Sequence, residues 1–320
     1  MTEFHRALLV VNLVAGQGRG RFTHGRVRRG LEAHGIACTE RFTSPTERGN
    51  AWARRAGDEG FDLIVVIGGD GTLQEVVAGQ ARAERKVTIA FVPSGTANVV
   101  GIALSLPWLP GAAVETILAG RVREFDVGYL PEVDRHFILM AAIGYPARII
   151  EGSTRRLKNI LGVFAYAWSG ARSLFTPRHA RVTITLDGDV HSFVAHTILV
   201  TNIGAIADLG LRVSPETSPH DGRFDLSVIS NRTLWDLVPV LLRMFTWRRP
   251  ARRLRYLDAR SVRIDADPPL PVQIDGESLG ATPFAADVLP GAVRLVVGSR
   301  YLRRTSSRPD AVDRHQTGRV

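Results

Sequence analysis

The chain has 320 residues and a mass of 35.0 kDa, which is enough for two compact domains with separate cores. Apolar residues make up 45% and charged residues 22%, which excludes a disordered chain, and the single cysteine excludes an intrachain disulfide or a cysteine-rich zinc site. A formal net charge of +10 favours anionic partners.

The first half of the chain alternates apolar, β-branched runs with helical segments, as βαβ units do. Strands are predicted over 7–11, 36–42, 61–67 and 88–92, with helices over 22–34, over 46–57 and after Thr72. The third run, FDLIVVI, is apolar almost throughout, which is typical of a parallel strand covered on both faces. We therefore expect residues 1–122 to form a doubly wound, parallel α/β domain.

A glycine-rich turn, GGDGT over 68–72, follows the third predicted strand and precedes a helix. Its glycines let the backbone approach a ligand closely, and the free N–H groups at the start of the next helix point at an anion. The turn lacks the Lys-Ser/Thr pair of a Walker A loop. A purely structural turn would rarely combine three glycines, an acid and a threonine here, so the turn predicts a phosphate-binding loop.

Two more turns are predicted at the same edge of the sheet. PSGTAN over 93–98 follows the fourth strand, and Asn12 with Gly16, Gly18 and Gly20 follows the first. Because the carboxyl ends of neighbouring parallel strands share one crevice, we expect the three turns to converge on one nucleotide. The G-x-G-x-G spacing of the first turn supports a Rossmann dinucleotide site only weakly.

The second half consists mainly of β-like runs with few helices between them, which predicts an antiparallel sandwich or barrel over residues 123–292. Helical insertions are predicted over 154–175 and 234–247. Residues 303–320 are predicted to be a disordered tail.

Two acidic turns stand out in this half, His220-Asp221-Gly222 and Asp275-Gly276-Glu277. An Asp-Gly pair taken alone more often marks a hairpin turn than a functional site. Beside a phosphate site the two turns gain a chemical meaning, since Asp221 could hold Mg²⁺ and Glu277 could accept a proton from an attacking hydroxyl.

A basic segment over 243–255 holds six arginines and no acid, with Phe245 and Trp247 between them. Such a segment suits nucleic acid or an anionic bilayer surface, and a solvated basic face is at least as common. No stretch of the sequence reaches the ~20 apolar residues of a membrane-spanning helix. With one cysteine, the default location is the cytoplasm.

The chain resembles the diacylglycerol-kinase-like catalytic domain of bacterial lipid kinases, a family that includes sphingosine and ceramide kinases, over about residues 5–300. The motifs that carry the resemblance are GGDGT over 68–72 with Leu73 and Glu75, PSGTAN over 93–98 with Leu106-Pro107, FILMAAIGYPARII over 137–150, Lys158 to Tyr166, Thr201-Asn202, Pro215 with DGRFD over 221–225, and VQIDGE over 272–277. Their order and spacing are hard to obtain by chance.

The resemblance implies a nucleotide domain similar to those of NAD kinases and phosphofructokinases, followed by a β-rich lipid domain, with a last strand near 293–302 returning to the first domain. It implies ATP and Mg²⁺ as cofactors and a catalytic role for Glu277 as proton acceptor and for Asp70. The implied ATP-binding residues are Asn12, Gly16, Thr43, Gly68, Gly69, Asp70, Gly71, Thr72, Gln74, Gly95, Thr96 and Asn98. Mg²⁺ would lie near Ser218, Asp221 and Arg223, with Asp221 as the side-chain ligand.

The sequence departs from the family pattern at Leu13, Ala15, Gln74, Val99 and Pro146. The resemblance implies transfer of the γ-phosphoryl group of ATP to a lipid hydroxyl by an enzyme that visits the anionic inner face of the membrane. An NAD kinase, or a catalytically weak lipid- or nucleotide-binding regulator, is the alternative. Nucleic-acid binding is not expected, because only the charge supports it. The lipid, the nucleotide preference and the oligomeric state, a homodimer included, are left open.

Overall fold

The fold was analysed in a computed structural model, which describes residues 4–144, 147, 179–203, 205–206, 211–212, 218–230 and 254–301. The predicted helical insertions over 154–175 and 234–247 lie outside the described residues, as do the predicted tail and most of the basic segment. No helix in the described ranges combines the length and apolar character needed to cross a membrane.

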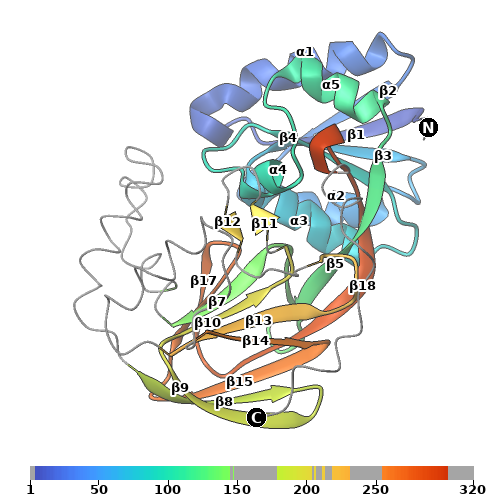
Figure 1. The fold of residues 1–320 in the computed structure, drawn as a ribbon. Helices are drawn as coiled ribbons and strands as arrows, with labels where there is room; N and C mark the ends of the chain where they lie inside the picture. The colour runs from blue at the N-terminus through green and yellow to red at the C-terminus, as the bar shows by residue number, and fades with distance from the viewer. Residues whose placement is uncertain are drawn as a thin grey trace.

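The first part of the chain builds a parallel sheet in the order β2-β1-β3-β4. Its strands are β1 (Arg6–Val11), β2 (Ala37–Phe42), β3 (Leu63–Gly68) and β4 (Thr88–Pro93). Its helices are η1 (Ala15–Gly18), α1 (Arg19–Glu32), α2 (Gly49–Arg55), α3 (Asp70–Ala81), α4 (Val99–Ala103) and α5 (Pro110–Leu118). Figure 1 shows α1 and α5 on one face of this sheet and α2 and α3 on the other.

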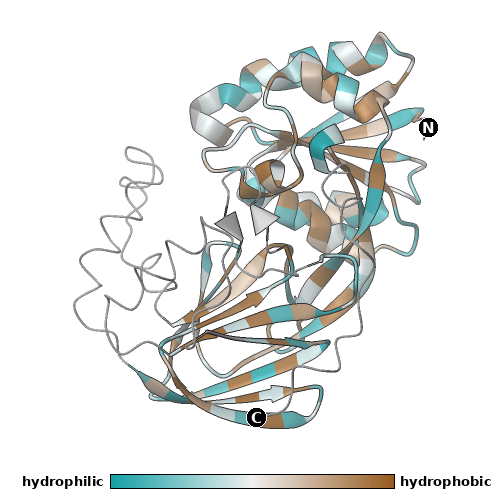
Figure 2. Cartoon of the chain, viewed as in Figure 1, coloured by the Kyte–Doolittle hydropathy of each residue, from teal (hydrophilic) through white to brown (hydrophobic). Residues whose placement is uncertain are grey.

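The side chains of β1 explain why both faces are covered. Ala7, Leu9 and Val11 pack with the apolar residues of α1 and α5, whereas Leu8 and Val10 pack with those of α2, α3 and α4. Successive side chains of a strand point to opposite faces, so a strand that is apolar at every position needs a helical layer on each side. Figure 2 shows this apolar character in the central strands.

The second part of the chain adds a mainly antiparallel sandwich. Strands β15, β8 and β9 continue the first sheet, and a second sheet has the order β14-β13-β10-β7-β16-β17. The strands are β5 (Val122–Leu130), β6 (Arg135–Phe137), β7 (Met140–Gly144), β8 (Ala180–Leu186), β9 (Asp189–Ala195), β10 (Thr197–Thr201), β11 (Ala205–Ile206), β12 (Leu211–Arg212), β13 (Phe224–Ile229), β14 (Leu254–Ala259), β15 (Ser261–Asp267), β16 (Pro271–Ile274), β17 (Glu277–Ala281) and β18 (Phe284–Val296). Alternate residues such as Ile184, Val200 and Leu226 fill the core between the two sheets.

Two long strands join the two parts of the molecule. β18 pairs with β15 and β5 and reaches β4, where Arg294 lies opposite Thr88 in a parallel register. The register between β18 and β5 shifts between Leu289 and Val293. Figure 1 shows both strands running from the sandwich up to the helical part.

The predicted fold class, a doubly wound α/β part followed by an antiparallel sandwich, is confirmed. The limits of the four strands predicted in the first half agree with the structure to within two residues. The last strand, expected near 293–302, is instead the end of β18, which begins at Phe284, ends at Val296 and pairs with β4 of the first sheet. The third helix starts at Asp70, inside the predicted glycine turn, because Gly69 is extended and acts as its N-cap.

Candidate active site

The three glycine-rich loops meet at the carboxyl ends of β1, β3 and β4, around a cleft of about 750 Å³. Helix α3 and the turns between β5 and β6 and between β16 and β17 complete its walls. The residues that line it are Asn12, Ala15, Gly16, Arg48, Asn50, Gly69, Gly71, Thr72, Gln74, Glu75, Ala78, Arg82, Gly95, Thr96, Asp134, Arg135, His136 and Glu277. The loops therefore come together, and Glu277 shares the cleft with them.

Glycine is required where the loops press against each other. A Cβ atom on Gly95 would lie 2.6 Å from the Gly69 Cα atom, and one on Gly16 would lie 2.0 Å from the Ser94 carbonyl oxygen. Gly16 also has a positive φ of 56°. A side chain at either position would force the loops apart, so these glycines set the width of the cleft.

Hydrogen bonds then fix the loops. The Asn98 side chain accepts from the Gly95 N–H and donates to the Gly95 carbonyl, both at 2.9 Å, so the PSGTAN loop closes on itself. The N–H groups of Ser94 and Gly95 donate to the Gly68 carbonyl. Asn12 donates from Nδ2 to the Thr72 hydroxyl at 3.1 Å, which joins the first loop to the second.

The Asp70 side chain caps the start of helix α4 and does not line the cleft. Its carboxylate accepts hydrogen bonds from the N–H groups of Val99 and Val100 at 2.9 and 3.1 Å, at the start of α4. Burial raises the pKa of Asp70 despite these bonds. The first turn of α3 behaves differently, because no side chain among the described residues caps it. Its free N–H groups lie at the cleft, where an anion can bind them.

Glu277 stands at the start of β17, on the turn that follows β16. Asp275 anchors this turn, because its carboxylate accepts hydrogen bonds from Ile138, Leu139 and Met140 at 2.7 to 3.0 Å. Burial of this carboxyl raises its pKa to about 6. The Glu277 side chain is about half exposed, at 54%. A carboxylate held on a fixed turn at the cleft can accept a proton from a bound hydroxyl.

The turn between β5 and β6 lies beside Glu277 in the cleft. Arg82, just after α3, pairs with Asp134, and the Gln74 side chain donates to the His136 carbonyl at 2.9 Å. Arg135 donates to Glu277 with an Nη2–Oε2 distance of 2.5 Å. Burial, with Arg82 nearby, lowers the pKa of His136 to about 4, so this imidazole is neutral at pH 7.

The structure thus separates the expected ATP-binding residues into two groups. The cleft is lined by Asn12, Gly16, Gly69, Gly71, Thr72, Gln74, Gly95, Thr96 and, on the opposite side, Glu277. Gly68, Asp70 and Asn98 lie behind this surface and hold the loops. Thr43 donates its N–H to the Val11 carbonyl at the end of β1 and does not line the cleft.

The expected metal residues Ser218, Asp221 and Arg223 do not line this cleft either. Asp221 lines a second pocket of about 850 Å³, beside β5 and the bend of β18. Arg223 pairs with Asp187 and Asp258. Asp221 and Glu277 thus line different pockets, because the turn before β13 is attached to β5 and not to the β16–β17 turn.

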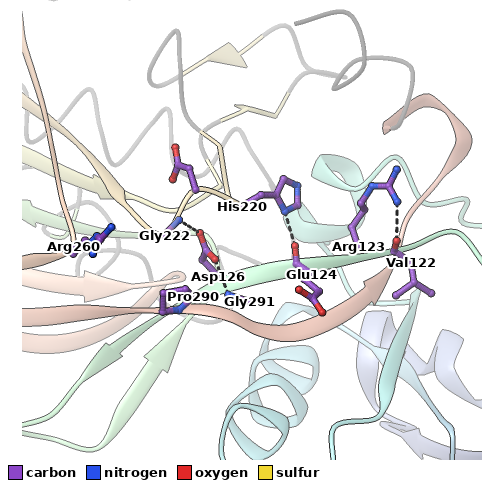
Figure 3. A pocket seen from close by; sticks show the side chains of 10 residues that line it. Val122, Arg123, Glu124, Asp126, His220, Gly222, Arg260, Pro290 and Gly291 are labelled. Atoms are coloured by element: carbon purple, nitrogen blue, oxygen red, sulfur yellow. Dashed lines mark hydrogen bonds between the residues drawn. The ribbon is translucent and has the colours of Figure 1, made fainter. Parts of the chain in front are cut away.

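Asp126 makes that attachment. Its carboxylate accepts from the Gly222 N–H at 2.7 Å and from the Gly291 N–H at 2.8 Å, and Figure 3 shows it between these two backbone groups. The pocket that Asp221 lines also contains the carboxyl groups of Glu124 and Asp126, the latter bound to two backbone N–H groups, and no group of three metal-ligating side chains occurs in the described part of the chain. Such a set suits Mg²⁺, which keeps several of its waters.

No sequence pattern marks Arg82, Asp134 or Arg135 as part of the site, or predicts the anchoring role of Asp275. Arg135 sits in a run that predicts only a strand, and nothing in its neighbourhood forms a motif. Asp275 belongs to the acidic turn that was singled out, but there only Glu277 was assigned a role. Contacts between residues more than a hundred positions apart, such as Arg135 with Glu277, leave no local pattern.

Comparisons with known proteins find matches to both parts of the chain. The family model described as "Diacylglycerol kinase catalytic domain" matches residues 6–130, and the one described as "YegS C-terminal NAD kinase beta sandwich-like domain" matches residues 140–297. A diacylglycerol kinase of Staphylococcus carnosus is 28% identical over 281 residues, covering 87% of this chain and 90% of that protein. The diacylglycerol kinase of Bacillus subtilis is 27% identical over 280 residues, covering 87% and 91%.

Among solved structures, the crystal structure of a diacylglycerol kinase from Bacillus anthracis has a TM-score of 0.78 and 25% sequence identity. The match covers 94% of this chain and 99% of that one. The similarity therefore extends over both parts of the fold, and the second family model spans the β16–β17 turn that carries Glu277.

Proposed function

This chain belongs to the diacylglycerol-kinase-like family of lipid kinases, and on that premise we propose that it transfers the γ-phosphoryl group of ATP to the hydroxyl of a diacylglycerol-like lipid. One observation carries the proposal: three loops suited to phosphates and the carboxylate of Glu277 line the same cleft. Membership of a kinase family implies the use of ATP.

The loops and the base have separate tasks in the proposed reaction. The N–H groups of the glycine loops and of the first turn of α3 hold the phosphates of ATP in place. Glu277 accepts the proton of the lipid hydroxyl as its oxygen attacks the γ-phosphorus. Positioning and charge neutralisation supply most of the rate enhancement in such transfers.

We also propose that Mg²⁺ binds at Asp221, with backbone carbonyls of Ser218 and Arg223 as further ligands. Bound there, it would neutralise negative charge beside β5 and the bend of β18, outside the phosphate cleft. Peripheral binding to an anionic membrane, for which the basic segment over 243–255 is the candidate, stays a prediction from the sequence.

The test is a transfer assay with γ-labelled ATP and Mg²⁺ on mixed micelles that each contain one candidate acceptor: diacylglycerol, monoacylglycerol, sphingosine or phosphatidylglycerol. Thin-layer separation of the labelled lipids identifies the product. Wild type should label one lipid class, and Glu277→Gln should lower kcat by about 10²- to 10⁴-fold with ATP affinity little changed, because only the proton acceptor is lost.

The matched control is Glu59→Gln, which removes an exposed carboxylate paired with Arg55 on α2, away from the cleft. It should leave kcat unchanged. Equal labelling by wild type and Glu277→Gln would contradict the proposal. A parallel reaction contains NAD and no lipid. If wild type labels NAD but none of the lipids, the protein is an NAD kinase and not a lipid kinase.

A further inference from the structure

Arg135 is the cleft residue that directly contacts Glu277. It begins β6, at the end of the turn that follows β5, and its side chain is 44% exposed. Its Nη2 atom lies 2.5 Å from Oε2 of Glu277, and both residues line the cleft formed by the three glycine-rich loops. The cleft that the loops line therefore contains a cation in direct contact with the Glu277 carboxylate.

The position of Arg135 relative to the loops is fixed through α3. This helix starts at the glycine-rich loop, and the chain just after it holds the β5–β6 turn through Arg82, whose guanidinium binds both the carboxylate and the carbonyl of Asp134. Midway, the Gln74 amide donates to the His136 carbonyl. Arg135 lies between these two anchored residues, so its backbone is held at a constant distance from the loops.

The positive charge of Arg135 is suited to neutralising negative charge in the cleft. Negative charge spreads over the γ-phosphoryl oxygens during transfer, and none of the three loops contains a lysine to neutralise it. Of the other cations that line the cleft, Arg82 is engaged with Asp134 and Arg48 lies 4.0 Å from Glu75. The Arg135 guanidinium has five N–H donors, and Glu277 is its only partner among the described residues.

We propose that Arg135 is a second catalytic residue, which contacts the transferring phosphoryl group while it orients the Glu277 carboxylate. This inference rests on the proposed lipid kinase function. In the step, the lipid oxygen forms a bond to the γ-phosphorus as its proton passes to Glu277. The bond from the γ-phosphorus to the β,γ-bridging oxygen breaks, and its electrons leave with ADP. Arg135 donates hydrogen bonds to the oxygens of the phosphoryl group while it is being transferred.

The test compares the steady-state kinetics of wild type, Arg135→Ala and Arg135→Lys over a range of ATP concentrations up to saturation, with the lipid that wild type labels. Arg135→Ala should lower kcat about 10²-fold and kcat/KM for ATP by the same factor, leaving KM almost unchanged, because the contact exists only in the transition state. Arg135→Lys should recover part of that loss, since it restores the charge but not the planar fork. Millimolar guanidinium should restore part of kcat to Arg135→Ala and none to Arg135→Lys.

The matched control is Arg55→Ala, which breaks an exposed arginine–carboxylate pair on α2 and should retain wild-type kcat. Thermal melting compares the folding of all variants. The inference would be overturned if Arg135→Ala had wild-type kcat, or if a raised KM were its sole defect. The lipid kinase function would still stand in that case, provided that wild type labels a lipid. Lack of rescue by guanidinium in a folded Arg135→Ala would overturn the inference too. If wild type labels no lipid, the proposed function itself fails.

Discussion

The two acidic residues that the sequence marks as catalytic have different surroundings. Glu277 is about half exposed and lines the cleft, whereas the Asp70 carboxylate is bound to the first N–H groups of α4. A carboxylate at this position compensates the positive end of a helix and satisfies donors that have no partner within it. Asp70 therefore supports the phosphate loops in this structure, and a direct catalytic contact stays a prediction.

We expect Asp70→Asn to weaken the start of α4 without removing the proton acceptor. The amide keeps one acceptor oxygen for two donors, so the free energy of unfolding should fall by about 1 to 2 kcal/mol. KM for ATP should rise, while kcat should fall far less than in Glu277→Gln. Urea unfolding and steady-state kinetics measure the two effects, and a loss of kcat as large as that of Glu277→Gln would assign Asp70 a chemical role instead.

The Asp275 carboxyl predicts a pH dependence of stability. Its pKa is raised from 3.8 to about 6, so the folded protein keeps a proton that the unfolded chain releases. The contribution of this group to the free energy of unfolding should therefore fall as the pH rises from about 4 to about 6, by at most about 3 kcal/mol. Asp275→Asn cannot titrate and should lose this fall.

Urea unfolding of wild type and Asp275→Asn across that pH interval measures the difference. Asp265→Asn, at a half-exposed position on β15, is the control and should retain the wild-type dependence. A wild-type profile in Asp275→Asn would mean that another group causes it.

At the scale of elements, the loops depend on contacts between glycines of different loops. Gly95 and Gly69 touch, and Gly16 rests on the Ser94 carbonyl. A sequence motif shows the glycines but not the surface that excludes a side chain. The same applies to α3, which links the phosphate loop at one end with the β5–β6 turn near the other through Arg82 and Gln74.

Gly95→Ala should therefore abolish ATP binding, whereas its effect on the free energy of unfolding should be small. The added Cβ would lie 2.6 Å from the Gly69 Cα atom and 2.7 Å from the Asn98 Oδ1 atom, so the two loops must separate. Gly111→Ala in α5 is the control, because no atom lies within 4 Å of its Cβ and a helix gains about 0.5 to 1 kcal/mol from alanine. Calorimetric titration with ATP measures binding, and unaltered affinity in Gly95→Ala would place the phosphates elsewhere.

At the scale of the whole molecule, β5 and β18 connect the α/β part to the sandwich. Asp126 on β5 is 2% exposed and ties Gly222 and Gly291 to this joint. The backbone carbonyl of Asp126 also accepts from the buried Asn202 side chain. These bonds place the sandwich, and with it Glu277, relative to the phosphate loops.

Asp126→Ala should lower the free energy of unfolding by about 1 to 3 kcal/mol, because it removes two partly buried hydrogen bonds that hold Gly222 and Gly291 at this joint. Activity should fall as well, since the cleft draws its walls from both parts of the molecule. Asp58→Ala, at an exposed position after α2, is the control for loss of a carboxylate. Urea unfolding measures the change, and a variant as stable as Asp58→Ala would show that the joint does not depend on Asp126.

The amino-acid sequence was sufficient to predict the doubly wound α/β part, the antiparallel sandwich and the convergence of three glycine loops, because strand periodicity, apolar runs and turn residues are local signals. It also pointed to Glu277 at the end of an acidic turn. Only the tertiary structure decided that Asp70 caps α4, that Asp221 lies in a separate pocket and that Arg135 meets Glu277. These pairings join residues tens to more than a hundred positions apart, and their distances follow from the packing of β5, β18 and α3, which no local pattern encodes.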